Sequence, residues 1–391
     1  MPPGTKNRRL YIGLKNLTVI FISIKGNGFV HKESALAEIG ENIVSAMMKR
    51  AVELSKLATV KTYPNPKVGA VIFDDEGKII SEGFTQEYGR DHAEADALRK
   101  IGFKAPGLNM AVTLEPCNHY GKTPPCAKAI LEAGVKAVFV AKKEENAKAV
   151  GGLDFLIQNG VKAALVKGFA GDVEEINRFF FKGIRTNLPW ITVKTAASKD
   201  GFITQKVGER CIISGSEAQI YVHKLRGEHS AIAVGANTVN IDDPMLTVRL
   251  VEGFDPQPVI FSRDFSLDLN SKVLERDPII FTSAREAHEI SSKWAKIEIL
   301  PENFELKVAL SILYTKYKIN SVLLEGGANL LKAFMEAGLV DEFQLIESEK
   351  IFGSGLKLFD ENRKKLFENS FDLTHSEKLG NDTLKIYRKK S

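Results

Sequence analysis

Three residues with metal-binding side chains constrain this chain more than any other feature. His92 is followed by Ala93 and Glu94, and Cys117 and Cys126 come later in the chain. One imidazole and two thiolates fill three of the four positions around a tetrahedral zinc ion, so the fourth stays available to water. A metal in such an open site lowers the pKa of its water to about 7. The set therefore predicts a hydrolytic site, and the fold has to bring three separate segments to one point.

Glu94 is expected to carry protons rather than bind the metal. It lies two residues after His92, so its carboxylate can reach a water molecule without occupying a coordination position. This is the logic of zinc-dependent deaminases. An alternative stays open, because His119 could complete a closed structural site and leave Glu94 as a solvated helix residue. Structural sites favour shorter spacings than that between Cys117 and Cys126, and the deaminase signature also has a shorter one.

Short apolar runs alternate with helical patterns in the first half. Apolar residues at helical spacing predict a helix over 42–58, and continuous apolar runs predict strands over 68–73 and 110–114. Further helices are expected over 92–101 and 124–133. Both metal-ligand segments then lie at helix beginnings, where the helix dipole favours anionic thiolates.

A boundary is expected at residues 186–189, because Pro189 ends the preceding helix and a new strand begins at Trp190. We therefore expect an extension over 1–39, an α/β/α domain over 40–186 and a second α/β domain over 187–391. Strands of the second domain are predicted over 190–194, 230–234, 258–261, 278–281, 321–324, 342–346 and 383–387.

Composition limits the class of protein. With 391 residues, 44% of them hydrophobic, the chain can form cores for two or three domains. A formal net charge of +5 suits an anionic small substrate and is too weak to predict a nucleic-acid partner. Three cysteines cannot form an even disulfide framework, so a reducing cytoplasm is expected. The apolar run 17–24 is far shorter than the roughly 20 residues that span a bilayer, so no membrane partner is expected.

Ordered motifs occur in both halves. The first half contains Pro64-Asn65-Pro66-Lys-Val-Gly69, His92-Ala-Glu94, Thr113-Leu-Glu-Pro-Cys117 and Gly121-Lys-Thr-Pro-Pro-Cys126. The second half contains Lys194-Thr-Ala-Ala-Ser-Lys-Asp200-Gly, Leu225-Arg226-Gly, the run from Gly235 to Arg249 and Leu324-Glu325-Gly-Gly-Ala-Asn. From about residue 40 to the C-terminus, the chain resembles the bifunctional deaminase/reductase family of riboflavin biosynthesis.

The resemblance implies a cytidine-deaminase-like first domain, a dihydrofolate-reductase-like second domain, and Zn²⁺ and NADPH as cofactors. It implies zinc-dependent hydrolytic deamination of 2,5-diamino-6-ribosylamino-4(3H)-pyrimidinone 5′-phosphate, followed by reduction to 5-amino-6-(5-phosphoribitylamino)uracil. The expected partner is this phosphorylated pyrimidine, and a homo-oligomer is expected. Two alternatives stay open: a zinc deaminase of another nucleobase or nucleotide with a second domain that is inactive or only binds, and a noncatalytic zinc-stabilised interaction protein.

The same resemblance assigns site residues. In the first domain it implies the zinc ligands His92, Cys117 and Cys126, the proton carrier Glu94, and the substrate contacts Asn65, His119 and Lys122, with Thr123 beside them. In the second domain it implies Lys194 as a catalytic residue. The implied cofactor contacts are Ala196, Ile212, Thr238, Asp242, Arg263, Gly326 and Gly327. The implied substrate contacts are Arg210, Arg226, Leu246, Arg249 and Glu325.

Two features of the second domain are less specific. Gly326-Gly327 lacks the full Gly-x-Gly-x-x-Gly fingerprint, so a plain strand-to-helix turn is an alternative to a phosphate site. Ile212 stands where the family often has a tryptophan, so a flat aromatic wall is absent from the expected pocket.

Overall fold

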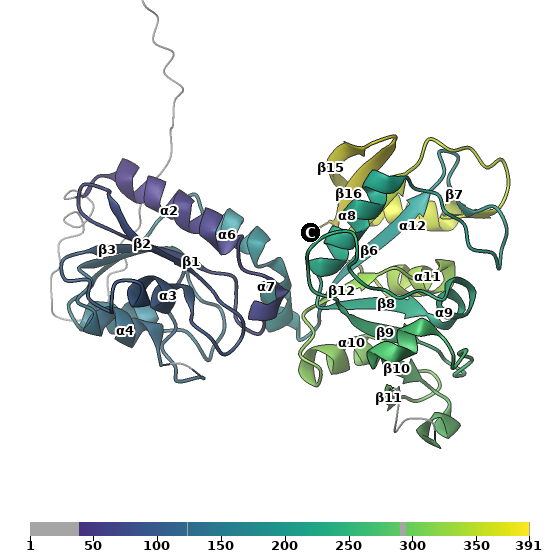
Figure 1. Cartoon of the computed structure of the whole chain (residues 1–391), viewed down its shortest axis with the longest axis horizontal. Helices are drawn as coiled ribbons and strands as arrows, with labels where there is room; N and C mark the ends of the chain where they lie inside the picture. The colour runs from purple at the N-terminus through teal and green to yellow at the C-terminus, as the bar shows by residue number, and fades with distance from the viewer. Residues whose placement is uncertain (1–38, 123, 290–294, 391) are drawn as a thin grey trace, which may run out of the picture. The chain divides into compact units, whose positions relative to one another are not determined.

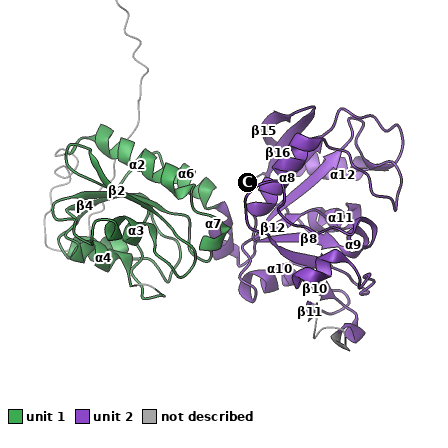
Figure 2. Ribbon diagram, in the orientation of Figure 1, with its two compact units in different colours: residues 1–177 green, residues 178–391 purple. Residues whose placement is uncertain are grey.

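The computed structural model describes residues 39–122, 124–289 and 295–390 (Figure 1). The chain divides into two compact units, residues 1–177 and 178–391 (Figure 2). The division precedes helix α7 (Arg178–Thr186), and the boundary expected after residue 186 lies at the other end of this helix. The extension expected over 1–39 lies outside the described residues as far as residue 38.

Unit 1 is built on a five-stranded sheet in the order β2-β1-β3-β4-β5. The strands are β1 (Gly69–Phe73), β2 (Ile79–Phe84), β3 (Asn109–Leu114), β4 (Ala137–Lys142) and β5 (Lys162–Leu165). β1 is antiparallel to β2 and β3, whereas β3, β4 and β5 are parallel. Every residue of β1 and β3 is buried, as expected for continuous apolar runs in strands covered on both faces.

Helices cover both faces of this sheet (Figure 1). α2 (Glu41–Ser55) and α6 (Ala170–Ile176) pack on one face, with the short η1 (Val60–Thr62) after α2. The other face carries α3 (Ala93–Arg99), α4 (Cys126–Glu132) and α5 (Gly152–Gln158). A Cβ atom on Gly83 would lie 2.2 Å from the carbonyl oxygen of Ala93, so only glycine lets α3 pack this closely on β2. Gly83 thereby positions the helix that begins directly after His92.

Unit 2 is built on a nine-stranded sheet in the order β11-β10-β9-β8-β12-β6-β13-β16-β15. Its strands are β6 (Trp190–Ala197), β8 (Ala231–Gly235), β9 (Gln257–Phe261), β10 (Ile279–Thr282), β11 (Lys296–Ile299), β12 (Ser321–Leu324), β13 (Glu342–Glu347), β15 (Phe371–Leu379) and β16 (Asp382–Lys389). Neighbours from β11 to β13 are parallel, and β16 and β15 are antiparallel. β7 (Phe202–Thr204) pairs with β14 (Leu356–Lys357) in a separate ribbon. Ligands of parallel α/β sheets bind at the carboxyl ends of the strands.

Alternate residues of the strands in unit 2 face two different cores. Ala231 and Ala233 of β8 face the core that contains α10 (Leu306–Thr315), α11 (Ala328–Glu336) and α12 (Glu361–Ser370). Ile232 and Val234 face α8 (Ser216–Gly227), α9 (Ala236–Asp242) and η2 (Lys272–Arg276) on the opposite side. A further short helix, η3 (Arg285–Glu289), follows β10. The mixed α/β class predicted from the alternating pattern is confirmed. No helix among the described residues is long and apolar enough to cross a membrane.

Candidate metal centre and ligand cavity

His92, Cys117 and Cys126 meet in unit 1. His92 precedes α3, Cys117 follows β3, and Cys126 is the first residue of α4. The Nδ1 atom of His92 lies 3.6 Å from the Sγ atom of Cys117 and 3.4 Å from that of Cys126. The three ligand atoms all lie within 4.8 Å of one another. Tetrahedral zinc with its usual bond lengths places nitrogen and sulfur about 3.6 Å apart, so the observed spacing fits zinc without rearrangement.

The chemistry of the two thiols agrees with a cation site. The Cys126 thiol donates a hydrogen bond to Cys117, which lowers the pKa of Cys117 well below its usual range and raises the pKa of Cys126. Burial raises the pKa of Cys126 further. Two adjacent thiolates in a buried site require a positive charge between them, which a zinc ion supplies. The residues present therefore fit the metal.

Glu94 lies in the first turn of α3 beside this centre and is not one of the three ligands. Its side chain is buried, with 4% exposed. Burial, and next the negative charge of Cys117, raise the pKa of Glu94 to about 7. The charge of a bound metal ion acts in the opposite direction. A buried carboxyl group in this position can accept a proton and release it again near neutral pH.

The segment before Cys117 is held by two residues that the sequence-based reasoning missed. The buried carboxylate of Glu115 accepts hydrogen bonds from three backbone N–H groups between residues 144 and 153, at 3.1 to 3.2 Å. A Cβ atom on Gly152 would lie 1.8 Å from the carbonyl oxygen of Pro116, so the start of α5 packs directly on this segment. The available signal was an acidic residue directly after a largely apolar strand.

The residues expected to bind the substrate in unit 1 lie on two loops. The Nδ1 atom of His119 is buried without a hydrogen-bond partner among the described residues. The Lys122 ammonium lies 4.0 Å from the centre of the Tyr88 ring. Asn65 lies in the turn after η1, where its backbone N–H donates to Thr62. Thr123 lies outside the described residues. The roles of Asn65, His119 and Lys122 stay predictions.

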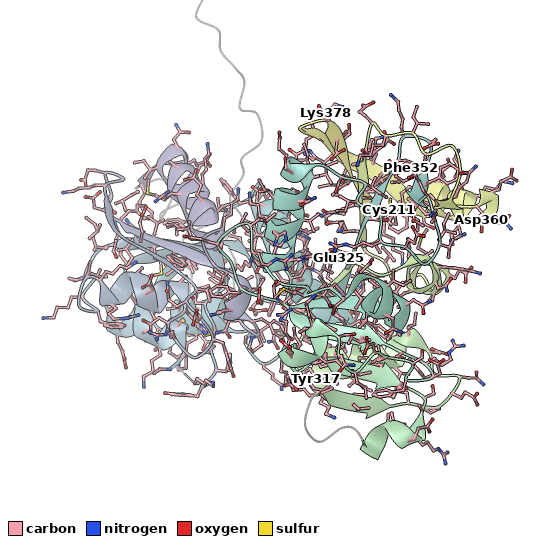
Figure 3. All side chains as sticks on the ribbon, turned by 45° about the vertical axis from the view of Figure 1, so that its right-hand side comes forward. Cys211, Tyr317, Glu325, Phe352, Asp360 and Lys378 are labelled. Carbon is pink, nitrogen blue, oxygen red and sulfur yellow. The ribbon has the colours of Figure 1, made fainter. Side chains whose placement is uncertain are left out.

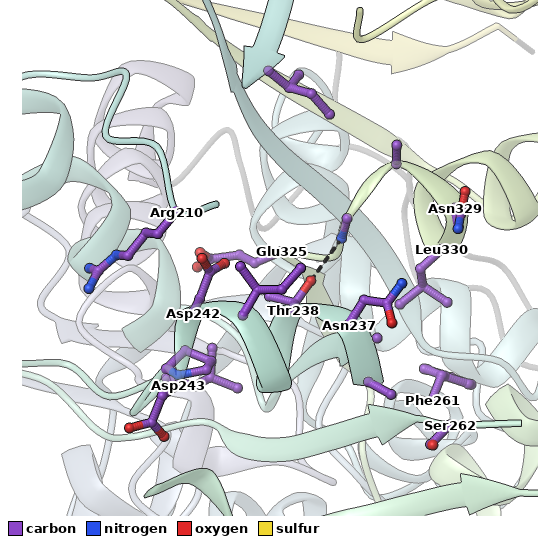
Figure 4. Close-up of a pocket in the computed structure, with 18 of the residues that line it drawn as sticks. Arg210, Asn237, Thr238, Asp242, Asp243, Phe261, Ser262, Glu325, Asn329 and Leu330 are labelled. Atoms are coloured by element: carbon purple, nitrogen blue, oxygen red, sulfur yellow. Dashed lines mark hydrogen bonds between the residues drawn. The ribbon is translucent and has the colours of Figure 1, made fainter. Parts of the chain in front are cut away.

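Unit 2 contains a cavity of about 1620 Å³ along the carboxyl ends of β8, β9 and β12 (Figure 4). The fold brings most of the residues assigned to this domain into its wall. These are Lys194, Arg210, Ile212, Arg226, Thr238, Asp242, Leu246, Arg249, Arg263, Glu325 and Gly327. Ala196 and Gly326 are not among the lining residues, and Ala196 packs against the core next to α8. Their roles as cofactor contacts, like the other assignments, stay predictions.

A buried charge cluster forms part of the cavity wall, with Glu325, which is labelled in Figure 3, at its centre. The Glu325 carboxylate accepts two hydrogen bonds from Arg226, at 2.8 and 3.0 Å, and its Oε2 lies 2.9 Å from the Lys194 ammonium. Burial alone raises the pKa of Glu325, but the two cations outweigh it and lower the pKa to about 2. The bidentate contact fixes the orientation of Arg226. The cluster therefore holds the Lys194 ammonium at one place in the cavity.

The starts of α9 and α11 are joined across the cavity. The backbone N–H of Gly327 donates to the Oγ1 atom of Thr238 at 3.2 Å, which is the dashed line in Figure 4. Backbone N–H groups at the start of a helix suit phosphate groups. Arg263 follows β9 at the same edge of the sheet. Ile212 lies at the wall with 61% of its surface exposed.

The loop 244–249 carries two of the expected substrate contacts. Leu246 is buried and has a φ angle of +53°, which is uncommon for a residue with a side chain. Arg276 holds this loop by donating to the carbonyl oxygens of Met245 and Leu246, at 3.0 and 2.9 Å. It also donates to the carbonyl oxygen of Pro256 at 3.0 Å. The sequence-based reasoning did not identify Arg276.

Both halves of the chain match known families. Residues 41–142 match the cytidine and deoxycytidylate deaminase zinc-binding region, and residues 189–385 match the RibD C-terminal domain. The riboflavin biosynthesis protein RibD of Aquifex aeolicus is 38% identical over 321 residues, which cover 80% of this chain and 89% of the relative. RibD of Escherichia coli K12 is 35% identical, over 78% of this chain and 88% of the relative.

Solved structures are similar to most of this chain. RibD of Acinetobacter baumannii, form 1, superposes with a TM-score of 0.81 at 32% identity and covers 90% of this chain and 100% of its own. A Thermotoga maritima diaminohydroxyphosphoribosylaminopyrimidine deaminase/5-amino-6-(5-phosphoribosylamino)uracil reductase superposes with a TM-score of 0.78 at 31% identity, over 89% and 99% of the two chains. The expected cytidine-deaminase-like and dihydrofolate-reductase-like domains are confirmed. This chain belongs to the RibD family of riboflavin biosynthesis proteins.

Proposed function

We propose that this chain catalyses two steps of riboflavin biosynthesis. Unit 1 deaminates 2,5-diamino-6-ribosylamino-4(3H)-pyrimidinone 5′-phosphate, and unit 2 reduces the ribosyl side chain of the product to ribityl. The observation that carries the proposal is the open set of His92, Cys117 and Cys126 with buried Glu94 beside it. The same chain holds a large cavity that contains Lys194. Membership of the RibD family supports both halves.

In unit 1 the chain binds the metal and moves protons. Zinc, when bound by His92, Cys117 and Cys126, supplies the positive charge that makes a water molecule nucleophilic near neutral pH. Glu94 takes a proton from this water as a C–O bond forms at the amino-bearing ring carbon. Glu94 then returns the proton to the nitrogen, the C–N bond breaks, and ammonia leaves. The burial of Glu94 keeps bulk water from competing for this proton.

In unit 2 the chain positions the sugar and provides a proton. NADPH, when bound, supplies the hydride that reduces C1 of the ring-opened ribose. The reduction also consumes one proton, and the Lys194 ammonium is placed to orient the sugar or to assist this transfer. Arg226 and Glu325 hold Lys194 in the cavity wall. Arg263 is the cation proposed to meet the 2′-phosphate of the cofactor, and comparing kcat/KM for NADPH and NADH tests this.

The central experiment separates the two half-reactions. Purified chain loaded with zinc is incubated with the diaminopyrimidine phosphate, with and without NADPH, while ammonia is assayed and products are resolved by mass. Without NADPH we expect ammonia and the deaminated ribosyl product, and with NADPH the ribityl product. Cys126→Ser should lose zinc and ammonia release together, because a thiolate is missing from the coordination set. Zinc-loaded wild-type protein that releases no ammonia from this substrate would contradict the proposal.

We also propose a reducing, cytoplasmic setting and a homo-oligomer. All three cysteines are free, which supports the reducing setting. Strand β15 forms an edge of the nine-stranded sheet, and residues 372–378 along it are exposed. Such an edge offers unpaired backbone groups to a second copy of the chain. Light scattering tests the oligomer, and a monomeric mass at micromolar concentration would rule it out.

A further inference from the structure

His223 lines the cavity of unit 2 without a role in the reaction described so far. It lies in α8 one turn before Arg226, and only 6% of it is exposed. The backbone N–H of Arg249 donates to its Nδ1 atom at 2.8 Å. An atom that accepts from an N–H group carries a lone pair, so the proton of the neutral ring is on Nε2. The contact with the loop 244–249 therefore sets the tautomer of His223.

The Nε2 atom of His223 is an unused donor on a residue that lines the cavity. It has no hydrogen-bond partner among the described residues. Nε2 is not one of the fully buried polar atoms without a partner, so it is accessible from outside the protein interior. His223 itself is part of the cavity wall. A ring held by one nitrogen and open at the other presents a donor in a fixed direction.

The charges around His223 favour an anionic ligand. Arg226 on the same helix, Arg249 on the facing loop and Lys194 on β6 are positive, whereas the carboxylate of Glu325 after β12 acts on the ring in the opposite direction. Burial, followed by the charges of Arg226 and Arg249, lowers the pKa of His223, so the ring stays neutral near pH 7. A neutral donor surrounded by cations suits an oxygen with negative charge.

We propose that His223 binds the phosphate group of the substrate that unit 2 reduces, by donating a hydrogen bond from Nε2. Through Nδ1, the same ring holds the backbone of Arg249, which also lines the cavity. This inference rests on the proposed reductase function and adds a residue to its substrate-binding site. His223 is a binding residue, since it offers one donor and no proton to the reaction.

The test measures KM and kcat of reduction with the deaminated, phosphorylated substrate. His223→Ala should raise KM about tenfold or more, because hydrogen bonds to charged groups contribute roughly 1.5 to 3 kcal/mol. KM for NADPH and kcat should change little. His223→Gln should recover most of the affinity, because a glutamine amide can accept from Arg249 and still donate. His223→Met keeps the volume of the side chain without either hydrogen bond. If alanine impairs folding, the methionine variant replaces it in the test and should show the same rise in KM.

His229 provides a matched control just beyond the same helix. It is 1% exposed, and both ring nitrogens already have partners, the carbonyl oxygen of Leu225 at 2.8 Å and the Oγ1 atom of Thr192 at 2.9 Å. It does not line the cavity. His229→Gln should therefore leave KM for the substrate unchanged in the folded fraction. Ammonia release by unit 1 serves as an internal control and should stay at the wild-type rate in all His223 variants.

A dephosphorylated substrate identifies the contact. The KM penalty of His223→Ala should disappear with this substrate, because the proposed acceptor is missing. An unchanged KM with the phosphorylated substrate, or an equal penalty on both substrates, would overturn the phosphate contact. A wild-type chain that performs no reduction at all would count against the proposed function of unit 2 instead.

Discussion

The carboxylate of Glu325 is buried and still ionised, because Arg226 and Lys194 contact it directly. Its pKa falls from 4.5 to about 2, so this stabilisation is complete above pH 4.5 and is lost as the pH falls toward 2. Glu325→Gln should lower the free energy of unfolding by roughly 3 kcal/mol, because it leaves two cations partly buried and unpaired. Both tryptophans, Trp190 and Trp294, belong to the sequence of unit 2, so their fluorescence in urea reports its unfolding. The difference in free energy of unfolding between the wild-type chain and Glu325→Gln should stay constant from about pH 5 to 8. A difference that shrinks near pH 6 would contradict the low pKa.

Glu94 is a second single residue whose carboxyl group matters, in this case because it carries protons. As a proton carrier outside the ligand set, it can be replaced without loss of the metal. Glu94→Gln should keep a full complement of zinc while ammonia release falls by roughly 10²- to 10⁴-fold, the range that general acid–base catalysis provides. Metal analysis and an ammonia assay on the same sample check this. Loss of zinc from a folded Glu94→Gln protein would show that the carboxylate belongs to the metal site.

At the scale of elements, the loop 244–249 depends on η2. Arg276, at the end of η2, donates to the carbonyl oxygens of Met245 and Leu246 within this loop and of Pro256 beyond it, and Leu246 is held there at a positive φ angle. Arg276→Met should raise KM for the reduced substrate about tenfold, because the loop that carries Arg249 loses its anchor. Arg276→Lys should recover part of the loss. The measurement is steady-state reduction at saturating NADPH.

Arg363 provides a matched control for the Arg276→Met prediction. Its side chain has the same exposed fraction as that of Arg276, 18%, and it pairs with Asp360 at the start of α12, outside the cavity wall. Arg363→Met should leave KM for the substrate unchanged. Equal KM values for the two methionine variants would mean that Arg276 contributes only general stability.

At the scale of the whole molecule, the two sites belong to separate compact units. Lys194→Ala should depress reduction strongly and leave ammonia release nearly unchanged, as expected for independent groups in separate compact units. Conversely, Glu94→Gln should still reduce substrate that has been deaminated beforehand. Each variant is assayed for both half-reactions with purified intermediates. Loss of both activities in either folded variant would contradict two independent active sites.

The sequence by itself determined the features that depend on local spacing and side-chain chemistry. His92, Glu94, Cys117 and Cys126 are few and reactive, and all but Cys117, which lies in the loop after β3, are at helix beginnings, so residue type and spacing were enough to predict their joint site. Largely apolar runs such as β1 and β3 were predictable, because strands buried on both faces are rich in apolar residues. In contrast, β15 could not be predicted, because it is an exposed edge strand with mostly polar side chains.

Only the tertiary structure decided which residues form the cavity wall of unit 2 and what holds them. Lys194, Arg226 and Glu325 come from β6, α8 and the end of β12, and their ion pairs exist only because the sheet places these elements together. The supporting roles of Glu115, His223 and Arg276 depend on contacts with backbone groups of other segments. Backbone N–H and C=O groups are the same at every position, so the sequence carries no local signal for such contacts, and only the folded chain selects them.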